Sequence, residues 1–136
     1  MIDPSLAIQA AIVAALRAPA SVKALIGNPA RVYDSVPTGA AFPYVSLGAS
    51  QVLNDGNGCG EQAEVYLSLD CWSRAVGFPE VRQIAAAVST ALSSPLTVTG
   101  YVVVIQDVED INYRRDADGL TSRATVALRL SLVASA

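Results

Sequence analysis

The sequence predicts an α/β (α+β) fold: a four- or five-stranded mixed or antiparallel sheet with two long helices packed on one face. Two patterns predict it. Apolar and polar side chains alternate in residues 62–74 and 122–134, which is the period of a half-buried strand. Apolar side chains recur at helical spacing in residues 4–17 and 79–93. A chain of 136 residues is a usual domain size, so we expect one domain over residues 1–136.

The N-terminal part is predicted to be helical. Asp3 is a good N-cap, and Pro4 suits the first helical position because proline has no N–H group to leave unpaired there. Pro19 ends this helix, since a proline clashes with the preceding turn. A short helical turn follows and ends at Gly27.

Two strands are expected next. Residues 31–36 form a short strand bounded by turn formers, and residues 44–53 form a longer one. Gly48 lies inside the longer strand and indicates a bulge or the close approach of another backbone. Strict alternation would place the following apolar side chains on one face: Val45, Leu47, Ala49 and Leu53.

A hairpin should connect this strand to the next one. Residues 54–60 are a run of turn formers, which predicts the exposed tip of the hairpin. In residues 62–74, the positions that alternate with the apolar ones include Tyr66 and Trp72. Large aromatic side chains on an outer face need a partner of some kind.

A second hairpin is expected at the C-terminus. Its first strand begins at Tyr101, and residues 116–119 form a tight turn before the last strand. In residues 122–134, arginines are among the positions that alternate with the apolar ones. If both long helices cover the apolar face, the opposite face of the sheet carries Tyr66, Trp72, Arg123 and Arg129.

The residue types that catalysis usually needs are scarce. The chain has no histidine, which removes the commonest general base and the commonest metal ligand. Cys71 lies on the apolar face of a predicted strand, where the thiolate is disfavoured, and Cys59 has no activating neighbour. Their spacing fits neither a disulfide framework nor a zinc site. We therefore expect no enzyme, no catalytic residue, no metal and no cofactor.

One acidic cluster needs separate treatment. Asp107, Glu109 and Asp110 resemble a site for a hard cation in composition. Along a regular strand, however, the first two share a face and Asp110 points away. Arg114 and Arg115 are close enough in sequence to neutralise these carboxylates, so a solvated strand end is favoured over a metal site.

Charge and composition limit the partners. Only 15% of the residues are charged and the net charge is −3, without a cluster of cations, which disfavours direct binding of nucleic acid. Such a low charged fraction indicates alanine-rich helices with few charged side chains outside, and a surface that other proteins cover. Arg17, Pro19 and Lys23 interrupt the apolar N-terminal stretch, and no cationic region precedes it. We expect a protein made in the cytosol, with no membrane contact.

Several local phrases, in their order and spacing, resemble one family. The phrases are Val22-Lys-Ala-Leu-Ile-Gly, Arg31-Val-Tyr-Asp-Ser-Val-Pro, Phe42-Pro-Tyr-Val-Ser-Leu, Asp70-Cys-Trp-Ser, the helix over 79–93, and Glu109-Asp-Ile-Asn-Tyr. Together they span nearly the whole chain. They resemble the phage tail terminator family, also called tail completion or head-tail joining proteins, which occurs in long-tailed phages and in gene transfer agents.

This resemblance implies a structural virion protein. The resemblance implies that copies of the chain form a hexameric ring. This ring would cap the head-proximal end of the tail tube, stop tube polymerisation and join the tail to the head connector. The implied partners are other copies of the chain, the tail tube protein and a connector or stopper protein. DNA would pass through the lumen without specific binding. The implied location is the head-proximal end of the tail, after assembly in the cytoplasm of the host bacterium.

A ring of identical subunits needs two different complementary patches on each subunit. We expect the outer sheet face to take part in subunit contacts through Tyr66, Trp72, Arg123 and Arg129. The hairpin tip would reach a neighbouring ring through Asn54, Asp55, Gly56, Asn57 and Gly58. An acidic lumen would be lined by Asp107, Glu109 and Asp110, which would suit the transit of DNA.

One alternative from a different class stays open. The outer face with Tyr66 and Trp72 could instead form an apolar pocket, which would make the chain a small non-enzymatic ligand-binding or regulatory module.

Overall fold

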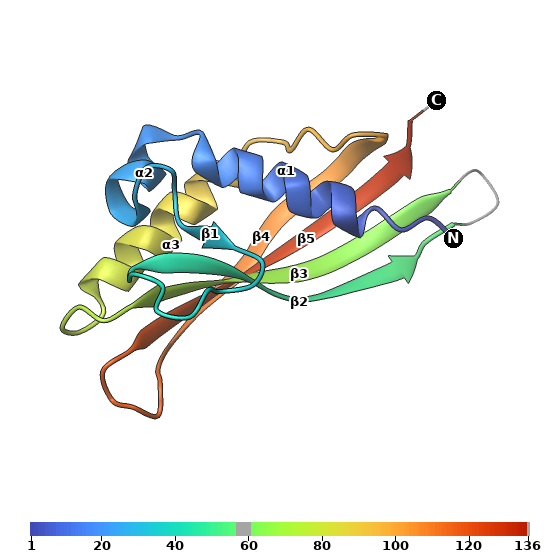
Figure 1. Cartoon of the computed structure of the whole chain (residues 1–136). Helices are drawn as coiled ribbons and strands as arrows, with labels where there is room; N and C mark the ends of the chain where they lie inside the picture. Colours follow the sequence, from blue (N-terminus) through green and yellow to red (C-terminus); the bar gives the residue numbers. More distant parts are fainter. Residues whose placement is uncertain (57–60, 136) are drawn as a thin grey trace.

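The computed structural model describes residues 1–56 and 61–135. Its elements follow one another as α1, Ser5–Arg17; α2, Ala20–Ile26; β1, Val32–Tyr33; β2, Tyr44–Asn54; β3, Gln62–Ser73; α3, Pro79–Ala91; β4, Tyr101–Arg115; and β5, Ser122–Ala134 (Figure 1). None of these helices is by itself long and apolar enough to cross a membrane. α1 and α2 meet that criterion only as a pair, and they are bent by 85° relative to each other.

The strands form one five-stranded sheet in the order β1-β2-β3-β5-β4. β1 runs parallel to β2, and every other neighbouring pair is antiparallel. The crossover through α3 leads the chain from β3 to the far edge of the sheet, and β5 then returns between β3 and β4. The expected mixed sheet of four or five strands is confirmed.

The helices lie on one side of this sheet, as Figure 1 shows. The core forms between α1, α3 and the inward faces of β3 and β5, and its large, fully buried side chains include Ile8, Ile12, Leu16, Ile84, Leu128 and Leu130. Burying such a side chain stabilises the fold by about 1.5–3 kcal/mol relative to leaving it exposed. The prediction of two long helices packed on one face is confirmed, and the short α2 lies on the same side.

The helix ends differ slightly from the sequence-based expectation. α1 begins at Ser5 with Pro4 as its cap, one residue later than expected; Asp3 accepts a hydrogen bond from the Ser5 N–H (3.0 Å). α3 ends at Ala91. Beyond α3, the side chain of Gln106 on β4 holds the backbone, because its amide donates to the carbonyls of Leu92 (2.6 Å) and Ser94 (2.8 Å).

A bulge in β2 changes which side chains face the core. The register shifts between Leu47 and Ser50, and an added Cβ on Gly48 would lie 2.4 Å from the Ser68 Oγ and 3.0 Å from the Ser68 carbonyl oxygen. The expected bulge and close approach at Gly48 are both present. Beyond the bulge Val52 pairs with Val65 on the core side, so the expectation that Leu53 faces the core is wrong.

β4 begins at Tyr101, as expected, and is irregular. It runs from Tyr101 to Arg115, and its register against β5 shifts between Val103 and Ile105 and again between Val108 and Asp110. Each shift inserts an extra residue, which interrupts the alternation of side chains.

Candidate protein interface

The sheet face opposite the helices carries the four side chains singled out in the sequence. Tyr66 lies directly opposite Arg129 in the β3–β5 register, and Trp72 lies opposite Arg123. In a strand pair, side chains at opposed positions lie on the same face. All four therefore lie on one face, which we call the outer face, and the polar groups of all four have partners within the chain.

The side chains of the outer face form two hydrogen-bonded clusters, and the first of them centres on Glu64. Its Oε1 accepts hydrogen bonds from the Tyr66 hydroxyl (2.7 Å) and from the Arg129 Nε (2.5 Å). These two hydrogen bonds hold the pKa of Glu64 below its usual value, and the bond from Arg129 has the larger effect. Donation to Glu64 raises the pKa of Tyr66. Arg129 also reaches Asp107 on β4, at 3.9 Å, so this cluster connects three strands.

The second cluster centres on Asp70, which is only 6% exposed. Arg123 binds both of its carboxylate oxygens at 3.1 Å, and the Thr125 hydroxyl donates to Oδ1 at 2.7 Å. The Arg123 guanidinium lies 4.9 Å from the centre of the Trp72 ring. The Trp72 indole N–H donates to the Ser46 hydroxyl at 2.9 Å. A buried carboxylate with a two-pronged arginine partner is well compensated.

A row of aromatic rings continues from Trp72 toward the β1 edge. The Tyr44 ring lies 6.4 Å from Trp72, 4.9 Å from Phe42 and 5.7 Å from Tyr33. Partial burial in this row raises the pKa of Tyr44. The sequence did not reveal this row, because Tyr33 and Phe42 lie in or beside other predicted elements and only the β2–β3 register brings Tyr44 opposite Trp72.

The acidic cluster on β4 differs from the expectation. Asp107 pairs with Arg129 and Asp110 with Ala127, and both of these partners lie on the outer face of β5. Asp107 and Asp110 therefore share a face, because Glu109 is the extra residue of the bulge. Arg129 is the arginine within ion-pair distance of Asp107, whereas Arg114 and Arg115 form no ion pair with the described residues.

The described residues offer little for chemistry. They contain no group of three acidic, histidine or cysteine side chains that could hold a metal ion. Burial raises the pKa of the Cys71 thiol to about 12, so it is protonated at neutral pH. In the hairpin tip, the Gly56 N–H donates to the Asn54 side chain at 3.2 Å, while Asn57, Gly58 and Cys59 lie outside the described residues.

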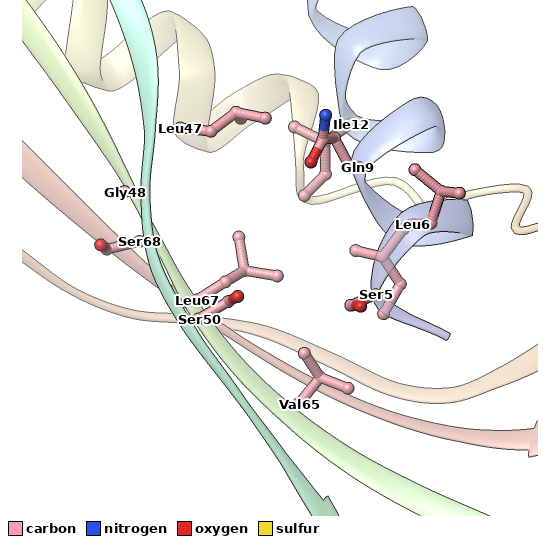
Figure 2. A pocket seen from close by; sticks show the side chains of 11 residues that line it. Ser5, Leu6, Gln9, Ile12, Leu47, Gly48, Ser50, Val65, Leu67 and Ser68 are labelled. Carbon is pink, nitrogen blue, oxygen red and sulfur yellow. The ribbon is translucent and has the colours of Figure 1, made fainter. Parts of the chain in front are cut away.

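A cavity lies on the helix side of the sheet and not on the outer face. It measures about 210 Å³ and is bounded by α1 and by β2 and β3, with Leu6, Gln9, Leu47 and Leu67 among its lining residues (Figure 2). Ligand pockets usually measure about 300–1,000 Å³. A separate hollow on the sheet includes Tyr66 but not Trp72. Neither hollow contains both Tyr66 and Trp72, the two side chains that the ligand-binding alternative places in one pocket.

Comparison with protein families identifies the chain. A family model described as Tail completion protein gp17 matches residues 10–131. The chain belongs to this family. The resemblance drawn from the sequence phrases is thus confirmed, and family membership gives the chain a structural role in tail completion and implies that it is not an enzyme.

Two solved structures are similar to this chain. A chain from the virion of a native gene transfer agent particle is 30% identical, with a TM-score of 0.88, over 98% of this chain and 99% of that one. The gp17 protein of bacteriophage SPP1 is 22% identical, with a TM-score of 0.64, over 93% of this chain and 88% of that one, and it shares the fold. A search of curated proteins finds no match.

Proposed function

We propose that this tail completion protein is a tail terminator. In this proposal it forms a hexameric ring at the head-proximal end of the tail tube, stops tube polymerisation and binds the connector or stopper protein, after assembly in the host cytoplasm. The family match over residues 10–131 and the relative in a gene transfer agent virion support the proposal.

The proposed ring rests on the outer face, which none of the described helices covers (Figure 1). A closed ring needs two unlike patches on every subunit. The outer face, with Tyr66, Trp72, Arg123 and Arg129, is one such patch in the proposal. Because these side chains already bond to Glu64, Asp70 and Ser46, a neighbouring subunit can cover them without leaving a buried charge unpaired.

Two further surfaces have proposed roles. Asp110 and Glu109 are exposed, and Asp107 is only loosely paired, with 61% of its side chain exposed. Facing a lumen, these three carboxylates would repel DNA phosphates and so limit adhesion of DNA in transit. The tip from Asn54 to Gly58 is the proposed contact with a neighbouring ring.

The experiment adds bulk and charge to the outer face without removing a contact. Ala127 lies at the middle of β5 on this face, between Ser68 and Asp110 in the sheet. Replacing it by arginine (Ala127→Arg) should abolish rings on purified tail tubes in electron micrographs. Ala86→Arg is the matched control, because Ala86 is exposed on α3.

Three results would decide the matter. Rings with the parent chain and with Ala86→Arg, but not with Ala127→Arg, support the proposal. Rings of normal number and size with Ala127→Arg would remove the outer face from the subunit contacts. Tubes that the parent chain does not cap and that go on growing in its presence would contradict the terminator role itself.

A further inference from the structure

The arginines among the described residues differ in whether they form ion pairs. Arg123 and Arg129 form ion pairs on the outer face, with Asp70 and Glu64 respectively. Arg74, Arg82 and Arg115 form no ion pair with any described residue, although the chain as a whole carries a net charge of −3. All three lie near the end of the sheet where β3 leads into α3 and where β4 turns into β5.

Aromatic rings hold these unpaired arginines in place. The Arg82 guanidinium lies 4.4 Å from the centre of the Tyr113 ring and 5.3 Å from that of Phe78. Arg115 lies 4.9 Å from the Phe78 ring on the same aromatic pair. A guanidinium that stacks on a ring is positioned at low entropic cost and keeps N–H groups along its edge for an incoming acceptor.

Arg74, at the same end of the sheet, is also held by an aromatic ring. Its guanidinium lies 4.3 Å from the Phe42 ring, and its Nε donates to the Thr121 hydroxyl at 3.3 Å, which connects the end of β3 to the β4–β5 turn. Asp118 in that turn is engaged by Thr121 and by the Leu120 N–H, which together hold the pKa of Asp118 at about 2. Glu80 accepts a hydrogen bond from the Ser73 hydroxyl. Neither carboxylate forms an ion pair with Arg74, Arg82 or Arg115.

Two apolar side chains are exposed in the same two connections. Val76, between β3 and α3, is 99% exposed, and Leu120, in the β4–β5 turn, is 70% exposed. Figure 1 shows both connections at the end of the sheet away from the chain termini. We call this set the hairpin-end surface: Arg74, Val76, Phe78, Arg82, Arg115 and Leu120. Arginine and aromatic residues around apolar anchors are the composition enriched at the centres of protein interfaces.

We propose that the hairpin-end surface docks an acidic segment of a neighbouring protein in the particle, with carboxylates on Arg82 and Arg115 and apolar contacts on Val76 and Leu120. This inference rests on the proposed function, because it assumes that the chain is built into a tail. DNA fits the surface less well, since a phosphate backbone offers nothing to cover the two exposed apolar side chains.

The test uses particles assembled in cells that lack the gene and receive a variant copy. Reversing both charges (Arg82→Glu with Arg115→Glu) should reduce the number of copies of the chain per particle by about tenfold or more, because like charges then oppose each other across the contact. Lys23→Glu is the control for charge reversal, because Lys23 lies on α2, away from both the outer face and the hairpin-end surface, and forms no ion pair with the described residues. Thermal melting checks that each variant folds.

A photocrosslinking amino acid at position 76 identifies the neighbour within these particles. We expect crosslinks to a peptide of another protein that contains Asp or Glu, and reversing the charge of that residue should restore incorporation of the doubly reversed chain. Normal incorporation of the folded double variant, crosslinks to DNA alone, or failure of the charge swap would overturn the inference. Each of these results leaves the terminator role standing, whereas absence of the parent chain from particles would contradict that role.

Discussion

Asp70 shows how one buried carboxylate organises the outer face. It is 6% exposed and depends on Arg123 and Thr125 for its hydrogen bonds. Arg123 in turn covers the Trp72 ring, so one arginine serves a charge and an aromatic surface together. Removing the arginine leaves a buried charge with only a hydroxyl partner, which costs more than the ion pair contributes.

Arg123→Met should therefore lower the free energy of unfolding by about 2–3 kcal/mol, because methionine keeps much of the packing on Trp72 but not the charge. Chemical denaturation measures the change. Arg114→Met is the control, since Arg114 lies opposite Arg123 on β4 without an ion pair among the described residues, and it should change stability by less than about 0.5 kcal/mol. Equal effects of the two substitutions would contradict this account of Asp70.

Among the elements, β2 and β4 show what alternation along a strand does not reveal. In β3 and β5 the side chains alternate without interruption, and there the inward and outward faces follow from the sequence. β2 and β4 contain bulges, which shift every later side chain to the opposite face. Gly48 signals the first of these, but nothing in the residue types around Glu109 signals the bulge that places Asp107 and Asp110 together.

Gly48→Ala tests the close approach in β2. The new Cβ would meet both the hydroxyl and the carbonyl oxygen of Ser68, and we expect a loss of about 1–3 kcal/mol in denaturation experiments. In a Ser68→Ala background the hydroxyl contact is absent, so the loss should be smaller. Additive effects of the two substitutions would show that the contact with the Ser68 hydroxyl is not responsible.

At the scale of the whole molecule, the composition of the outer face could be predicted but its bonding could not. Alternation in residues 62–74 and 122–134 is enough to place Tyr66, Trp72 and the two arginines on one face. Which carboxylate each arginine binds depends on cross-strand register and on rotamers. The hairpin-end surface was missed for a related reason, since it is assembled from two connections and a helix start that are distant in sequence.

Burial of Cys71 couples the stability of the whole molecule to alkaline pH. The unfolded thiol ionises near pH 9, whereas the folded thiol has a pKa of about 12, so the folded state retains its proton longer. This contribution is fully present below pH 9 and falls as pH rises from 9 toward 12, by about 1.4 kcal/mol per pH unit. In a Cys59→Ser background, urea denaturation between pH 8.5 and 11 should show this slope. Cys71→Ala should keep only a smaller slope, from Tyr44 and Tyr66, whose pKa values are also raised. Identical slopes would refute the coupling.

The irregular edge strand has one more consequence. β4 lies at the edge of the sheet, and a long flat edge is a template on which other chains add strands and aggregate. The two bulges twist this edge, and the exposed carboxylates of Glu109 and Asp110 add charge beside it. Such features discourage uncontrolled strand addition between copies of the chain, so this edge is a poor starting point for aggregation.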